Sequence, residues 1–235
     1  MKYEEHVMDR LVLFDIDKTL LVGSTVHYTA LKNALSEVYG IKNPQPVKNM
    51  QGMTDLKIIC ETLLQENIDL KTIKSGLDQC MGIMYLKYKH ALQKQDLKVL
   101  EGVKELLENL QRAGIPMGLV TGNMEAIAWL KLEKVGLNKY FNFGGFGDKI
   151  IKRSGLVKNA IKTSEETLGK LDNRKIFLIG DTPRDIIGGQ KVGVRTIGVA
   201  TGDFSEEELA KVGADFIVSD LKDSERLLKI IMEFK

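Results

Sequence analysis

The chain has 235 residues, of which 43% are apolar and 28% charged, the ordinary composition of a globular protein long enough to bury a core. Lysine and arginine total 34, and aspartate and glutamate total 32. The resulting formal charge of +2 excludes the strongly basic footprint of a general nucleic-acid binder. No apolar run approaches the ~18 residues of a membrane span. We therefore expect neither a nucleic-acid nor a membrane partner.

The cysteine content and the first residues of the chain indicate the cellular compartment of the protein. Only Cys60 and Cys80 occur, both within helix-patterned segments, so we expect two buried thiols rather than a disulfide framework. Residues 1–6 are polar and carry acids, unlike a signal or transit peptide. These features predict a reduced, cytoplasmic setting.

Four short apolar runs are typical of strands buried on both faces: residues 11–14, 117–120, 176–179 and 196–199. Helix-period patterns separate or follow them at 103–110, 127–135, 156–168 and 227–231, and Gly114, Gly136 and Gly169 are expected helix stops. Strands alternating with helices predict an α/β fold, with a Rossmann-like parallel sheet covered by helices on both faces.

The stretch from about 25 to 95 has a different pattern. It shows three helix-period stripes and no convincing strand, with Thr54 as an expected helix N-cap. We therefore expect a small helical-bundle cap domain at 23–95, inserted into a core domain formed by 1–22 and 96–235.

Polar residues follow three of the predicted strands. Asp15 and Asp17 follow the first, Thr121-Gly122-Asn123 follow the second, and a segment containing Asp181 and Asp185 follows the third. Ligands of open parallel sheets bind outside the carboxyl ends of the strands. Each short motif is weak by itself, but their order along the sheet predicts one shared site.

The chemistry of these residue types points to phosphate and a metal ion. Asp15, Asp17 and Asp181 offer the hard oxygen ligands that Mg²⁺ prefers, Asp17 through either its side chain or its backbone carbonyl. A carboxylate can also act as a nucleophile and form an aspartyl phosphate, while a second carboxyl group moves the proton. Thr121 and the amides of Gly122 and Asn123 open a helix, where phosphate is readily bound.

These residues resemble the haloacid dehalogenase superfamily over nearly the whole chain. Residues 14–20 (FDIDKTL) resemble its first motif, 121–123 (TGN) its second and 180–185 (GDTPRD) its fourth. The insertion resembles a helical cap, with residues 52–55 (GMTD) at its substrate-specificity loop. Residues 196–202 and 213–215 resemble the phosphoglycolate-phosphatase-like branch.

The resemblance implies roles for individual residues. Asp15 would be the nucleophile and a metal ligand, and Asp17 the general acid/base, with its carbonyl on the metal. Thr121 would bind the transferring phosphoryl group, and Asp181 would complete the Mg²⁺ site with Asp185 close behind. Further residues expected at the phosphate or the substrate are Gly122, Asn123, Thr54 and His27. His27 either helps to position Asp17 or packs at the hinge.

The cation of the third motif is less defined, because relatives carry a lysine before a proline and this chain has no proline there. Residues 152–158 (KRSGLVK) match the region. Arg153 is favoured by alignment, Lys158 by its place at a helix start, and Lys152 is a third candidate. We expect one of them to balance the charge of the acids and the phosphate.

Together these features predict a Mg²⁺-dependent phosphomonoester phosphatase that forms an aspartyl phosphate. A small cap implies a small phosphorylated metabolite, 2-phosphoglycolate or a sugar-phosphate-like compound. The alternatives are a β-phosphoglucomutase-like phosphomutase or a non-catalytic phosphate-ligand-binding protein. Asp55, where mutase-like caps usually carry a basic residue, weakens the mutase hypothesis. We expect a monomer or a homodimer.

Overall fold

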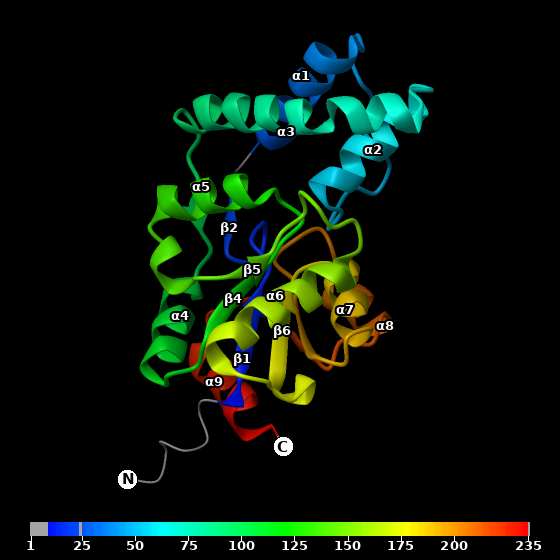
Figure 1. Cartoon of the computed structure of the whole chain (residues 1–235). Coiled ribbons are helices and arrows are strands. Elements are labelled where there is room, and N and C mark those ends of the chain that lie inside the picture. Colours follow the sequence, from blue (N-terminus) through cyan, green and yellow to red (C-terminus); the bar gives the residue numbers. More distant parts are fainter. Residues whose placement is uncertain (1–8, 24, 235) are drawn as a thin grey trace.

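The computed structural model describes residues 9–23 and 25–234 (Figure 1). The polar segment 1–6, on which the targeting prediction depends, lies outside these residues. The main sheet has the strand order β5-β4-β1-β6-β7-β8, and all of its neighbouring strands run parallel. Its strands are β1 (Leu11–Phe14), β4 (Met117–Val120), β5 (Gly144–Gly145), β6 (Ile176–Gly180), β7 (Arg195–Val199) and β8 (Phe216–Val218). The predicted α/β fold class and its four strands are confirmed, while β5 and β8 are too short to have been predicted.

Helices cover both faces of this sheet. They are α4 (Val103–Arg112), α5 (Glu125–Val135), α6 (Arg153–Leu168), α7 (Pro183–Gln190), α8 (Glu206–Lys211) and α9 (Ser224–Glu233), with 3-10 turns at Asn138–Tyr140 and Asn173–Lys175. Side chains alternate across β1: Val12 and Phe14 join the core with α4, α5 and α9, whereas Leu11 and Leu13 join α6 in a second core. The continuous apolar run of β1 therefore reflects burial on both faces.

Three helices lie between the short strands β2 (Leu21–Val22) and β3 (Lys98–Val99), which pair antiparallel. They are α1 (His27–Tyr39), α2 (Asp55–Gln65) and α3 (Leu70–Leu92), and Figure 1 shows them stacked beyond the carboxyl ends of the main strands. We call residues 27–92 the helical cap; its limits at 23 and 95 stay a prediction. Thr54 caps α2 as expected, since its side chain accepts a hydrogen bond from Lys57 N at 3.2 Å. Within the described residues, no helix has both the length and the apolar character needed to cross a membrane.

Candidate active site

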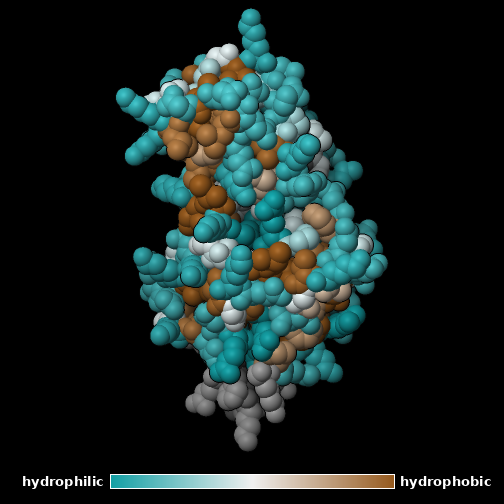
Figure 2. All heavy atoms as spheres, turned by 90° about the vertical axis from the view of Figure 1, so that its right-hand side faces the viewer, coloured by the Kyte–Doolittle hydropathy of each residue, from teal (hydrophilic) through white to brown (hydrophobic). Residues whose placement is uncertain are grey.

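A cavity of about 480 Å³ lies between the strand ends and the segment that joins α1 to α2. Its floor is formed by strand-end residues, and its roof by residues 47–58. The face in Figure 2 is mostly hydrophilic, with hydrophobic patches near the level where the helical cap meets the sheet part. The volume falls in the range typical of small-molecule sites. Of the site residues predicted from the sequence, those that line the cavity are Asp15, Asp17, His27, Thr121, Gly122, Asn123, Arg153 and Asp181.

Three buried carboxylates meet in the floor. Asp15, Asp181 and Asp185 each place one oxygen within 4.8 Å of the others. Asp15 follows β1, and its amide donates to Ile179 O at 2.9 Å, which fixes the end of β1 against β6. Burial, together with neighbouring carboxylates, raises the pKa of Asp15 to about 7 and that of Asp181 to about 8. Such a set of hard oxygen donors fits a divalent cation like Mg²⁺.

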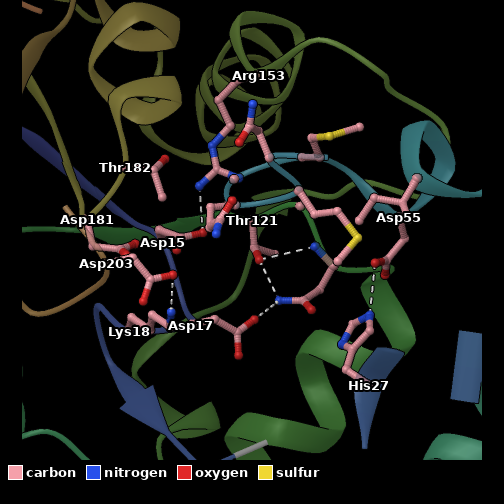
Figure 3. Close-up of a pocket in the computed structure, with 18 of the residues that line it drawn as sticks. Asp15, Asp17, Lys18, His27, Asp55, Thr121, Arg153, Asp181, Thr182 and Asp203 are labelled. Carbon is pink, nitrogen blue, oxygen red and sulfur yellow. Dashed lines mark hydrogen bonds and ion pairs between the residues drawn. The ribbon is translucent and has the colours of Figure 1, made fainter. Parts of the chain in front are cut away.

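The guanidinium of Arg153 crosses from α6 into this cluster. It is the first residue of α6 and is buried. Its Nη2 donates to Asp15 Oδ1 at 2.6 Å (Figure 3). Its Nε donates to Asp185 Oδ1 at 2.6 Å. Burial opposes its charge, but the two aspartates outweigh that effect and raise the pKa of Arg153. Asp185 also accepts from Thr182 in the capping box that begins α7, so its carboxylate is held from two sides.

Among the cations proposed for the third motif, the structure places Arg153 at the site. Lys158 is exposed five residues further along α6 and lines a separate surface hollow with Lys162 and Lys191. Lys158 does not line the cavity, because helical rotation carries it away from the strand ends, and this placement does not support the expectation that it binds phosphate. Lys152 is also exposed and does not line the cavity.

The carboxylate of Asp17 is held apart from the other acids. The chain turns sharply after β1, with Lys18 in the left-handed region at φ 62° and the amides of Leu20 and Leu21 bonded to Ile16 O. Asp17 then accepts from Lys131 Nζ at 2.7 Å and from Asn123 Nδ2 at 2.7 Å. Partial burial would raise the pKa of Asp17, but the charges of Lys131 and His27 and the hydrogen bonds from Lys131 and Asn123 together outweigh it and hold the pKa below its ordinary value.

Lys131 is a site residue that the sequence analysis missed. Its side chain is 1% exposed and lies on the inner face of α5, where Nζ also donates to Asn123 Oδ1 at 2.9 Å. A signal did exist, because Lys131 stands four residues after Ile127, on the apolar face of the predicted helix. A lysine at such a position needs a buried partner, but the sequence does not say which one.

The segment after β4 is less open to an anion than expected. Thr121 Oγ1 accepts from the amide of Asn123 at 3.3 Å and from its side chain at 2.7 Å. The next amide, Met124 N, donates to Asp55 Oδ2 at 2.7 Å. In this arrangement the Asn123 amide already donates to a protein oxygen, so its binding to phosphate stays a prediction.

Asp55 ties the roof to the floor. Its other oxygen lies 2.9 Å from His27 Nε2, and its amide donates to Gly122 O at 2.8 Å. His27 thus contacts the roof through Asp55, and it acts on Asp17 through its charge, which helps to lower the pKa of that carboxyl group. Thr54, expected at the substrate, is buried and does not line the cavity. It caps α2, and its hydroxyl donates to Ile151 O at 3.4 Å. The expectation that Thr54 contacts substrate is therefore not met.

A family model described as "Haloacid dehalogenase-like hydrolase" matches residues 12–199, which include the floor segments that follow β1, β4 and β6. The chain belongs to this family. It is a hydrolase, and relatives of this chain are named phosphoglycolate phosphatase and pyrophosphatase.

Two curated relatives illustrate the range of names. A phosphoglycolate phosphatase of Agrobacterium fabrum is 29% identical over 51% of this chain and 50% of its own length. The match with that relative thus spans about half of its length. Pyrophosphatase PpaX of Bacillus pumilus is 27% identical over 90% of this chain and 93% of its own.

Solved structures share the fold. β-Phosphoglucomutase from Clostridium difficile superposes with a TM-score of 0.73 at 16% identity, covering 96% of this chain and 98% of its own. A predicted phosphoglycolate phosphatase from Haemophilus somnus gives 0.68 at 19% identity, covering 94% and 98%. At these identities the likeness establishes the fold alone.

Proposed function

We propose that the protein is a Mg²⁺-dependent phosphatase that hydrolyses phosphomonoesters of small metabolites through an aspartyl phosphate. The observation that carries the proposal is the buried floor, where Asp15 lies beside Asp181 and the Arg153 guanidinium. The names of the relatives support phosphate chemistry, since one names a phosphomonoester, 2-phosphoglycolate, and the other a phosphoanhydride, pyrophosphate. Asp15 and Asp181 would hold Mg²⁺, joined by the Asp17 carbonyl, and the ion would neutralise charge on the transferring phosphoryl group.

In the first step a carboxylate oxygen of Asp15 attacks phosphorus and the ester P–O bond breaks. The leaving oxygen takes a proton from Asp17. Arg153 holds the other oxygen of Asp15, so that the nucleophile keeps one orientation. Thr121 lines the cavity at the end of β4, within reach of the transferring group.

In the second step water attacks phosphorus of the aspartyl phosphate and releases inorganic phosphate and free Asp15. The proton from water goes to Asp17, which restores the acid. Once Asp17 has given its proton to the leaving oxygen, Lys131 and Asn123 stabilise the carboxylate that remains, and this carboxylate accepts the proton from water.

A phosphomutase is less well supported. Its second phosphate would need a positive group in the roof, and there the carboxylate of Asp55 is bonded to Met124 N and His27 instead. A non-catalytic binding protein would have no need of the complete set of Asp15, Asp17, Asp181 and Arg153.

The test measures phosphate release from a panel of small phosphomonoesters with Mg²⁺ and with EDTA. We expect release that needs Mg²⁺ and that falls on the order of 10³-fold or more in Asp15→Asn. Full turnover in that variant would overturn the aspartyl-phosphate route. Isomer interconversion without release would establish the mutase, and tight binding without either reaction would establish the binding protein.

A further inference from the structure

The cavity presents a marked excess of carboxylates to its substrate. Five aspartates line it, against two permanently charged cations, Lys18 and Arg153: the five are Asp15, Asp17, Asp55, Asp181 and Asp203. Behind the lining, Lys131 offsets Asp17 and Asp185 offsets Arg153. At the floor, the charges of a bound divalent cation, the remaining carboxylates and the transferring phosphoryl group would balance one another.

No lining cation in the described part of the chain lacks a carboxylate partner. Lys18 Nζ lies 2.6 Å from Asp203 Oδ2, and Arg153 bonds to Asp15 and Asp185. His27 Nε2 lies 2.9 Å from Asp55 Oδ1. A second anionic group on a substrate would therefore have to displace one of these carboxylates, and like charges brought together at a recognition site disfavour binding strongly.

The described side chains that line the roof carry no positive charge, so the roof is not suited to bind an anion. Its lining side chains are four apolar groups, two amides and one acid: Val47, Met50, Met53, Ile58, Asn49, Gln51 and Asp55. Two nearby roof lysines do not line the cavity: Lys48 is exposed, and Lys57 pairs with Glu61. The roof thus offers apolar contact for carbon atoms and amide groups for hydroxyls.

The roof is docked on the floor in this structure, so its lining faces the leaving group directly. Asp55 N donates to Gly122 O at 2.8 Å, and Leu56 N to Gly147 O at 3.0 Å. Gly122 permits this approach, since a Cβ there would lie 2.1 Å from Met53 O. Arg184 closes the rim by donating to Gln51 O at 3.0 Å and Asn49 O at 3.2 Å.

From this charge distribution we infer that the enzyme selects phosphomonoesters whose leaving group is a neutral, hydroxylated alcohol, of the sugar or polyol class, and rejects substrates with a second anionic group. The inference rests on the proposed phosphatase function. It sets this chain apart from the substrates in the names of its relatives, because 2-phosphoglycolate carries a carboxylate and pyrophosphate a second phosphate.

The experiment compares matched pairs that differ only by a carboxylate in place of a hydroxymethyl group. The pairs are 2-hydroxyethyl phosphate with 2-phosphoglycolate, and glycerol 3-phosphate with 3-phosphoglycerate. We expect kcat/KM with Mg²⁺ to be at least about tenfold higher for the neutral member of each pair. A preference for the anionic members would overturn the inference while leaving the phosphatase intact. Release from none of the four or from the wider panel would overturn the proposed function and the inference with it.

A charge placed in the roof tests the cause. Met50→Lys adds a cation to the cavity lining, and we expect it to raise the ratio of kcat/KM for 2-phosphoglycolate over 2-hydroxyethyl phosphate by about tenfold. Leu86→Lys is the matched control, because Leu86 is 63% exposed on α3 and does not line the cavity. An unchanged ratio in a folded Met50→Lys protein, or an equal shift in both variants, would show that the roof charge does not set the selection.

Discussion

The floor and the roof of the cavity are held in different ways. In the floor, charged side chains from separate elements bind one another: Asp17 bonds to Lys131 of α5, and Asp15 to Arg153 of α6. The roof is held mainly by its backbone, through amides of residues 55 and 56 that donate to carbonyls of Gly122 and Gly147. Asp55 is the exception, since its side chain reaches Met124 N.

This difference predicts where in the cavity a substitution affects the site. A floor built from paired charges depends on the identity of each side chain, because removing one partner leaves the charge of the other uncompensated. The roof is held through its backbone, so it depends on the close approach of its main chain to that of the floor. Its side chains can vary without breaking this contact, and they determine which leaving group is bound. The variants below test this contrast, from the largest expected effect to the smallest.

Lys131→Met removes one charge from the floor. We expect kcat to fall on the order of 10²-fold with little change in KM, because Asp17 loses the partner that orients it. The Asp17 side chain is 42% exposed and keeps its hydration, so the protein should still fold. Steady-state kinetics and thermal melting measure both effects.

The control is Lys134→Met, which removes an exposed lysine one turn further along α5. It should match the wild type in both measurements. A Lys131→Met protein with wild-type kcat would show that the ion pair is only structural.

Gly122→Ala tests the backbone contact of the roof. The new Cβ would lie 2.1 Å from Met53 O, so the roof must move away from the floor. We expect KM to rise about tenfold, since the leaving group loses its contacts. Gly82→Ala is the control: Gly82 lies within α3 with open space around its Cβ position, and alanine there should leave KM unchanged and stabilise the helix by up to about 1 kcal/mol. Equal KM values in the two variants would refute backbone docking.

The floor should also make stability depend on pH and metal. Because folding raises the pKa of Asp15 to about 7 and that of Asp181 to about 8, the folded state binds more protons than the unfolded state between about pH 4 and pH 8. Metal-free protein should therefore lose stability as pH rises through this range. Added Mg²⁺ should raise Tm more at about pH 8 than at about pH 5.

Differential scanning calorimetry in EDTA and in Mg²⁺ measures these shifts. Asp181→Asn should flatten the pH dependence and reduce the Mg²⁺ effect, since it removes one of the two shifted carboxylates. An equal Mg²⁺ shift at both pH values would contradict the assignment of the ion to these acids.

Arg184→Gln gives the smallest effect. Arg184 is half-buried at the rim and bonds to two roof carbonyls, so its loss should raise KM only about two- to threefold. Lys191→Gln, at the end of the same helix, should leave KM unchanged. A tenfold rise in Arg184→Gln would show that the rim, rather than Gly122, holds the roof.

The amino-acid sequence alone determined the fold class and much of the floor. Apolar runs predicted β1, β4, β6 and β7 because strands buried on both faces need uninterrupted hydrophobic residues. Asp15 and Asp181 were predicted from position, since residues that follow parallel strands meet at one edge. β5 escaped prediction because it consists of two glycines, and β8 because it has three residues.

Only the tertiary structure decided which partners meet. Arg153, Lys152 and Lys158 are close in sequence, but Arg153 binds Asp15 whereas Lys158, five residues further along α6, lies on another face of the helix and is exposed. Lys131 and Asp17 are 114 residues apart, and no local pattern encodes their contact. Helical periodicity sets the face on which a side chain lies, whereas its partner depends on how helices and strands pack, which is why the ion pairs of the floor and the docking of the roof required the folded molecule.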